Sequence, residues 1–167
     1  MPSKIKTIAT KIFPSPEDPS FQKKLNYWQF KEEKLVFTNG CFDILHLGHV
    51  DYLSRAADLG DILIVGLNTD DSVRRIKGSE RPLNNQQARA SLLASLFFVD
   101  AVVLFHQDTP YQLIETVQPD VLVKGSDYKE EEIVGAEIVK ARNGQVVTID
   151  LLPGFSTSGL LKKLNKK

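Results

Sequence analysis

Five short apolar runs, separated by longer amphipathic stretches, constrain the fold of this 167-residue chain more than any other feature. The runs are Leu35–Thr38, Ile62–Leu67, Ala101–Phe105, Val121–Val123 and Val146–Leu151. Short apolar runs bounded by polar segments are typical of buried strands, and the stretches between them have helical spacing. Parallel neighbours in a sheet need helical crossovers, so the alternation predicts an α/β fold with a doubly wound sheet of about five parallel strands.

Two local signals are expected to mark helix ends. Gly60 is expected to end the helix after the first strand in a left-handed cap. Asn84, with Gln87 three residues later, is expected to form the capping pair that opens the helix around Leu92.

Residues 1–33 differ in composition from the rest of the chain. They contain four prolines and the aromatic residues Phe21, Tyr27, Trp28 and Phe30. The length of the whole chain suits one compact domain rather than two. We therefore expect residues 1–33 to be an N-terminal extension packed on a single domain formed by residues 34–167.

The composition excludes several classes of protein. Acidic and basic residues balance at 21 each, so no global field draws the chain to nucleic acid or to a membrane surface, and neither is expected as a partner. The single Cys41 excludes an internal disulfide and a cysteine metal cluster. No apolar run has the length of a membrane span or the form of a signal peptide. These features predict a cytoplasmic protein.

The run Gly40-Cys41-Phe42-Asp43-Ile44-Leu45-His46-Leu47-Gly48-His49 carries the main chemical signal. It joins a predicted strand to a predicted helix, where the first helical amides are unpaired and favour an anion. His46 and His49 would add donors to that site, and Gly48 would let a phosphate approach the backbone. The structural alternative is two ordinary polar histidines in a turn.

Two imidazoles at a helix N-terminus suit attack on the α-phosphorus of a nucleoside triphosphate. Charge builds up on the phosphoryl oxygens and on the departing pyrophosphate, so fixed donors matter most and no covalent nucleophile is needed. Further positive charge is expected from Lys77, Arg81, Arg89 and Lys124, close to the predicted carboxyl ends of strands. Lys77 and Arg81 are expected to lie in a loop with Gly78 and Pro82, whose charges could close over phosphates. The G-x-G-x-x-G and P-loop patterns are absent.

The run resembles the signature G-x-F-D-x-x-H-x-G-H of the cytidylyltransferase-like nucleotidyltransferases, a family with a Rossmann-like α/β fold. Segments 38–40, 77–82, 122–128 and 156–157 are also similar to the adenylyltransferase domains of ADP-heptose synthases. The resemblance covers residues 34–167 and identifies them as a nucleotidyltransferase domain. Many such domains are fused behind a sugar kinase, for which this chain is too short, so it resembles the stand-alone form.

The resemblance implies adenylyl transfer from ATP to D-glycero-β-D-manno-heptose 1-phosphate, giving ADP-heptose and pyrophosphate for the lipopolysaccharide inner core. ATP and a sugar 1-phosphate are the expected partners, Mg²⁺ is expected with ATP, and a homodimer is compatible with the resemblance. One alternative is another nucleotidyltransferase of the same fold, such as a glycerol-3-phosphate cytidylyltransferase. Another is a catalytically silent nucleotide-binding module.

The predicted site residues fall into two groups. His46, His49 and Lys77 are expected to act in catalysis. The nucleotide and phosphate contacts are expected from Thr38, Gly40, Phe42, Gly48, Arg81, Arg89, Lys124, Gly125, Asp127, Ser156 and Thr157. The resemblance assigns Ser156 and Thr157 to the β and γ phosphates, although both could simply cap the last helix. Arg89 faces the site by its family position, or else pairs with an acid.

The carboxylates of Asp43 and Asp70 are expected to orient other groups or bind substrate. A phosphate dianion is already a competent nucleophile near neutral pH, so a general base is hardly needed. Asp43 is expected to orient its loop or a histidine ring, and Asp70 to bind a ligand hydroxyl or to cap the next helix. No dedicated metal cage is expected, while His106 is expected at the surface and Cys41 in the core.

Overall fold

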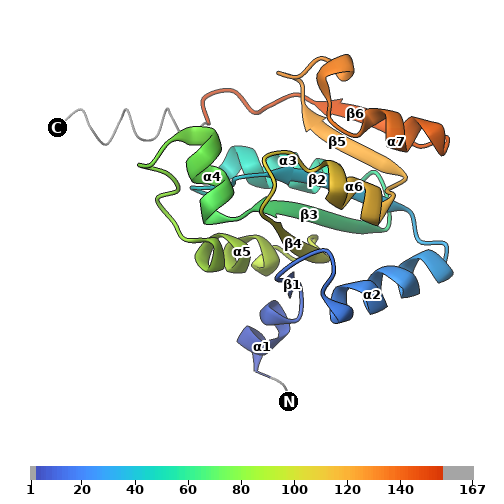
Figure 1. The fold of residues 1–167 in the computed structure, drawn as a ribbon, viewed down its shortest axis with the longest axis horizontal. Coiled ribbons are helices and arrows are strands. Elements are labelled where there is room, and N and C mark those ends of the chain that lie inside the picture. Colours follow the sequence, from blue (N-terminus) through green and yellow to red (C-terminus); the bar gives the residue numbers. More distant parts are fainter. Residues whose placement is uncertain (1–2, 156–167) are drawn as a thin grey trace.

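A computed structural model describes residues 3–155 and shows a parallel α/β fold (Figure 1). The strands are β1 (Ile12–Phe13), β2 (Leu35–Gly40), β3 (Ile62–Asn68), β4 (Ala101–Phe105), β5 (Val121–Gly125) and β6 (Gln145–Ile149). They form one six-stranded sheet in the order β1-β4-β3-β2-β5-β6, with every neighbouring pair parallel. The predicted α/β class and parallel sheet are confirmed, and the sheet has one strand more than the five expected.

The helices of the described residues cover both faces of the sheet. They are α1 (Lys4–Ala9), α2 (Pro19–Phe30), α3 (Leu47–Ala57), α4 (Asp70–Lys77), α5 (Gln86–Ser95), α6 (Tyr111–Val117) and α7 (Ala136–Ala141), with a 3₁₀ turn at Glu130–Glu132. Side chains of α2, α6 and α7 share one buried cluster with Phe37 of β2. Side chains of α3 and α5 share the other with Val36. Consecutive residues of a strand thus point to opposite faces of the sheet and pack into different buried clusters. Both faces need apolar side chains, which explains the continuous apolar runs.

The extra strand comes from the N-terminal part of the chain. Ile12 and Phe13 pair with Val102 and Val103 at the β4 edge of the sheet. Phe13 and three residues of α2, Phe21, Leu25 and Trp28, lie in the same buried cluster as Phe37. Two residues are too short a run to show a strand period in the sequence. Residues 3–33 therefore contribute to sheet and core, and the domain boundary at residue 33 stays a prediction.

Both predicted helix-end signals are wrong in detail. Helix α3 ends at Ala57, and Gly60 is not among the residues with positive φ. A Cβ at Gly60 would lie 2.5 Å from the carbonyl oxygen of Lys34, so close packing against the start of β2 requires glycine there. Asn85, not Asn84, caps α5, and its side chain accepts a hydrogen bond from the amide of Ala88 at 2.9 Å.

The strand order reverses between β2 and β5. From β2 the chain proceeds through β3 to β4 on one side, and it then returns to place β5 and β6 on the other. In open α/β sheets the crevice outside the carboxyl ends of strands at such a reversal is the usual ligand site. The loop that carries the histidines leaves the carboxyl end of β2 at this point.

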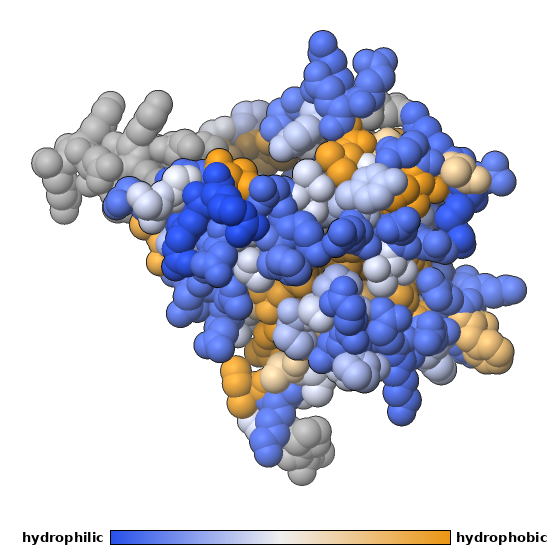
Figure 2. Space-filling view, viewed as in Figure 1, coloured by the Kyte–Doolittle hydropathy of each residue, from blue (hydrophilic) through white to orange (hydrophobic). Residues whose placement is uncertain are grey.

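The surface of the molecule is largely polar on the face that Figure 2 draws. Small hydrophobic areas lie between the polar side chains there. No helix within residues 3–155 is long and apolar enough to cross a membrane.

Candidate active site

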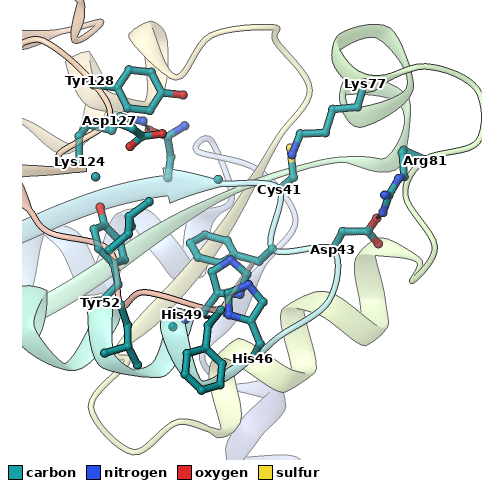
Figure 3. A pocket seen from close by; sticks show the side chains of 18 residues that line it. Cys41, Asp43, His46, His49, Tyr52, Lys77, Arg81, Lys124, Asp127 and Tyr128 are labelled. Atoms are coloured by element: carbon teal, nitrogen blue, oxygen red, sulfur yellow. Dashed lines mark hydrogen bonds and ion pairs between the residues drawn. The ribbon is translucent and has the colours of Figure 1, made fainter. Parts of the chain in front are cut away.

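A cavity of about 530 Å³ opens at the carboxyl ends of β2 and β5 (Figure 3). Its wall contains most of the predicted site residues: Gly40, Phe42, Asp43, His46, Gly48, His49, Lys77, Arg81, Lys124, Gly125 and Asp127. Asn39, Cys41, Tyr52, Tyr128, Leu151, Leu152 and Phe155 complete it. Segments far apart in the sequence thus meet at the point where the strand order reverses.

The two histidines are stacked at the start of α3. Their ring centroids lie 3.8 Å apart at an interplanar angle of 16°. His46 is the N-cap residue, and its Nδ1 accepts a hydrogen bond from the amide of His49 at 3.3 Å. Nδ1 of His46 is therefore an acceptor, which places the proton of the neutral ring on Nε2. Phe42 packs edge-on against His49, with 5.2 Å between ring centroids.

Gly48 lets the two rings stack. A Cβ at this position would lie 3.1 Å from Nδ1 of His46 and 3.1 Å from Cβ of Phe155. Both contacts are tighter than ordinary van der Waals separations, so any larger residue must displace the His46 ring or the segment that carries Phe155. The glycine predicted to admit a phosphate thus also fixes the histidine geometry.

Burial keeps both imidazoles neutral near pH 7. Desolvation lowers the pKa of His49 to about 4, with further lowering from His46 and Lys77 and a partial offset from the carbonyl of Ile44. The pKa of His46 is also lowered, chiefly by burial. Nδ1 of His49 is buried without a hydrogen-bond partner in the described part of the chain. The pair can donate hydrogen bonds to phosphate oxygens without adding positive charge.

Three cationic side chains surround the histidines in the cavity wall. Lys77 ends α4 and extends toward Cys41 (Figure 3). Arg81 lies in the following loop. Lys124, near the end of β5, donates a hydrogen bond to Oδ1 of Asn39 and lies 5.6 Å from the ring centroid of Tyr128. Burial lowers the pKa of Lys124 to about 8, although Asp127 opposes the shift.

Three predicted residues are not in the cavity wall. Arg89 is buried, with Nη2 donating to Asp70 at 2.7 Å and Nη1 donating to the carbonyl of Cys41 at 2.6 Å. It pairs with an acid beneath the site, which is the alternative left open by the sequence. Asp70 is the first residue of α4, and Thr69 caps that helix instead. Thr38 is buried, 2.8 Å from the hydroxyl of Tyr52.

The remaining predicted residues divide into three cases. The carboxylate of Asp43 contacts a loop, where it accepts from Arg81 and from the amides of Leu83 and Asn84, and within the described residues it has no hydrogen bond to a histidine ring. Ser156 and Thr157 lie outside the described residues. His106 is exposed, as expected, whereas Cys41 is only partly buried and lies in the cavity wall instead of the core.

A second cavity of about 290 Å³ adjoins the first. The two share Asn39, Gly40, Cys41, Lys77, Lys124 and Tyr128. The second extends toward β3, β4 and the 3₁₀ turn, where it is lined by Asn68, Ile76, Asp108, Thr109, Pro110, Glu132, Ile133 and Val134. Two ligands bound in these cavities would therefore meet beside Lys77 and Lys124.

Within residues 3–155, no three His, Cys, Asp or Glu side chains are grouped to hold a metal ion. Asp127 is a carboxylate in the wall of the larger cavity that could approach a cation. This wall suits a Mg²⁺ ion that arrives on a triphosphate, because such an ion keeps several waters and needs few protein ligands.

The comparison with known families decides the identity of this fold. The model of the cytidylyltransferase-like family matches residues 37–159, which include the histidine run and the whole cavity wall. The chain belongs to the cytidylyltransferase-like nucleotidyltransferases.

The curated relatives of this nucleotidyltransferase include bifunctional proteins named HldE. It is 57% identical over 136 residues to the bifunctional protein HldE of Helicobacter hepaticus, covering 81% of this chain and 27% of that protein. It is 51% identical over 144 residues to HldE of Magnetococcus marinus, covering 86% of this chain and 30% of that one. The chain thus spans less than a third of the length of these curated relatives.

Two solved structures share the fold. The lipopolysaccharide core biosynthesis protein of Thermoplasma volcanium is 31% identical, with a TM-score of 0.63, covering 72% of this chain and 98% of that one. The pantoate-beta-alanine ligase of Francisella tularensis, solved with β-γ ATP and β-alanine, has a TM-score of 0.64 at 18% identity. That match covers 93% of this chain and 73% of the ligase, and it shows the fold alone.

Sequence reasoning assigned no site role to several wall residues. Tyr52 lies three residues after His49 on α3, so the helical period could have placed it on the same face. Leu151 and Leu152 follow the last strand, and their place at the carboxyl end of β6 was the available signal. The position of Tyr128 in the wall depends on the path of the chain after β5. The sequence has no periodic pattern there that would predict this path.

Proposed function

We propose that this nucleotidyltransferase transfers AMP from ATP to a sugar 1-phosphate, specifically D-glycero-β-D-manno-heptose 1-phosphate. A nonbridging oxygen of the sugar phosphate attacks the α-phosphorus of ATP. The bond from that phosphorus to the oxygen bridging to the β-phosphate breaks, and pyrophosphate leaves. The products are ADP-heptose and pyrophosphate, with no covalent enzyme intermediate.

The observation that carries this proposal is the junction of the two cavities. ATP fits the larger one, where the amides at the start of α3 and the stacked histidines form an anion site. The sugar phosphate fits the smaller one, whose polar groups include Asn68 and Thr109. The shared wall, with Lys77 and Lys124, is where the two reacting phosphates would meet.

Neutral histidines and charged lysines have different tasks in this arrangement. In-line displacement concentrates charge on the equatorial oxygens of the transferred group, where fixed donors stabilise the transition state. His46 and His49 supply such donors without changing protonation state near pH 7. Lys77 and Lys124 offset the repulsion between two anionic substrates. Mg²⁺ would neutralise the pyrophosphate as it leaves.

The choice of substrates follows from the relatives. HldE proteins are more than half identical to the matched part of this chain, and one relative is named for lipopolysaccharide core biosynthesis. The motifs most similar to adenylyltransferases favour ATP over CTP, and the apolar wall of Leu151, Leu152 and Phe155 suits a base. With ATP as donor, the reaction belongs in the cytoplasm. Homodimer formation stays a prediction, which the molar mass of the protein in solution tests.

Pyrophosphate release by the purified chain with Mg²⁺ tests the proposal. ATP and CTP are compared against heptose 1-phosphate, other sugar 1-phosphates and glycerol 3-phosphate. Release with ATP and the heptose alone is the expected result. Preference for CTP or another phosphate would refute the assigned substrates while leaving nucleotidyl transfer in place. If folded protein releases no pyrophosphate with any of these nucleotides and phosphates, the proposal is contradicted and a nucleotide-binding module without catalytic activity is favoured.

Matched variants test whether the cavity is the active site. His46→Gln and His49→Gln remove the imidazole donors and should each lower turnover about 100-fold or more, the effect typical of an oxyanion donor. His106→Gln removes an exposed histidine that lines neither cavity and should leave turnover unchanged. Near-normal turnover in a folded His49→Gln variant would contradict the assigned role.

A further inference from the structure

The loop after α4 is fastened to the loop that carries the histidines. Gly78 begins it with a φ of 94°, and Arg81 lies three residues further in the cavity wall. The carboxylate of Asp43, a residue that is 5% exposed, makes the hydrogen bonds that connect the two loops. A buried carboxylate needs donors for both oxygens, and here both are supplied by this loop.

The two oxygens of Asp43 have separate partners. Oδ2 accepts a hydrogen bond from Nη1 of Arg81 at 2.7 Å. Oδ1 accepts from the backbone amides of Leu83 at 2.7 Å and of Asn84 at 3.1 Å. Asn84 completes the connection by donating its side-chain amide to the carbonyl of Asp43 at 2.8 Å. Four hydrogen bonds therefore join one residue of the histidine loop to the Arg81 loop.

Arg89 supports the same two loops from beneath. Its Nε donates to the carbonyl of Asn84 at 3.0 Å, and its Nη1 donates to the carbonyl of Cys41 at 2.6 Å. Cys41 precedes Asp43 by two residues, so each loop is held both by Asp43 and by the buried guanidinium. The buried Arg89 thus fixes the two loops to each other below the cavity. Within the cavity wall, the contact between the two loops is the ion pair of Asp43 with Arg81.

We propose that Asp43 is a positioning residue, which holds Arg81 at the cavity wall and keeps its loop in register with His46 and His49. Arg81 has five N–H donors, and the pairing with Asp43 leaves others for a triphosphate. The catalytic part of this inference rests on the proposed nucleotidyl transfer. It adds that the guanidinium is set in place before the nucleotide binds.

Asp43 is not placed to act as a base. No hydrogen bond joins its carboxylate to either histidine ring among the described residues, and both oxygens already accept from the Arg81 loop. Burial would raise the pKa of Asp43, but donors from Asn84, Arg81 and Leu83 outweigh it and hold the pKa below its usual value. The carboxylate stays ionised and occupied throughout the neutral range.

Hydrogen exchange tests the fastening without any substrate. The amides of Leu83 and Asn84 should exchange about tenfold or more faster in Asp43→Ala than in the unmodified chain, because their acceptor is lost. Asp43→Asn keeps an acceptor oxygen and should preserve most of the protection. Asp71→Asn, which changes an exposed residue paired with Arg74, is the control. Equal protection of both amides in all variants would overturn the proposal.

A double-mutant cycle tests whether Asp43 acts through Arg81. Asp43→Asn and Arg81→Gln should each lower kcat/KM for ATP about tenfold, as expected for a lost charge-assisted hydrogen bond. The double variant should be no slower than Arg81→Gln alone. If the losses of kcat/KM in the two single variants multiply in the double variant, Asp43 does not act through Arg81 and the proposal is overturned. The proposal is also overturned if Asp43→Asn removes the acidic limb of the pH profile of kcat/KM, because Asp43 would then act as a base. If the chain transfers no nucleotide, hydrogen exchange still decides the fastening.

Discussion

Acid should destabilise this protein through His49. The pKa of this buried ring is about 4 in the folded chain, against an ordinary value of 6.5. Between these values the unfolded chain binds more protons than the folded one, so stability falls as the pH falls. The contribution of His49 is fully present above about pH 6.5 and decreases toward pH 4.

The size of the effect follows from the pKa difference. Lowering the pH from 7.5 to 5 should cost about 2 kcal/mol of unfolding free energy through His49 alone, since each unit of pKa difference corresponds to about 1.4 kcal/mol. Other groups, Asp43 among them, also respond to acid. The effect of His49 is therefore the difference in acid response between the unmodified chain and His49→Gln.

Urea unfolding at pH 7.5, 6 and 5 measures that difference. The His49→Gln variant should lose about 2 kcal/mol less than the unmodified chain over this range. His106→Gln, which changes an exposed ring, should lose as much as the unmodified chain. An equal acid response in His49→Gln and the unmodified chain would refute the claim that His49 is buried and neutral.

Three further perturbations test separate parts of the site. Gly48→Ala should leave the unfolding free energy within about 1 kcal/mol, because better helix propensity offsets tight contacts, while turnover falls at least about tenfold as His46 is displaced. Unchanged turnover would show that the close approach is unimportant. Arg89→Met should lower the unfolding free energy by about 3 kcal/mol, since it leaves Asp70 without its buried partner, whereas Arg74→Met, which breaks an exposed pair with Asp71, should cost under about 1 kcal/mol in the same urea titration. Equal losses in the two arginine variants would contradict this ranking. Removing Mg²⁺ with EDTA should abolish pyrophosphate release and adding Mg²⁺ back should restore it, and full activity in EDTA would exclude a metal requirement.

The parallel sheet and the histidine site could be predicted because each has a local signal in the sequence. Buried parallel strands are apolar on both faces, so β2, β3, β4 and β5 are visible as continuous runs. The edge strand β6 is only partly buried, and its signal is limited to Val146, Val147 and Ile149. His46, Gly48 and His49 are adjacent in sequence and share one helix start, so their proximity needs no tertiary information.

Several outcomes that the sequence left open or missed depend on contacts between distant segments. Arg89 follows Asn85, the cap of α5, by one helical turn, which is compatible with both a cavity and a buried position. Its partners come from two other segments, at Asp70 and Cys41, and only the folded sheet brings these together. The two-residue strand β1 likewise depends on its pairing with β4.

The fate of individual phosphates of ATP tests the central claim most directly. The purified chain is incubated with Mg²⁺, heptose 1-phosphate and ATP labelled in either the α or the γ phosphate, and the labelled products are separated. Nucleotidyl transfer at this cavity predicts that the α label moves into a nucleotide sugar and the γ label into pyrophosphate. A γ label on the sugar, with ADP as the other product, would contradict the account, and so would the absence of a labelled product of either kind.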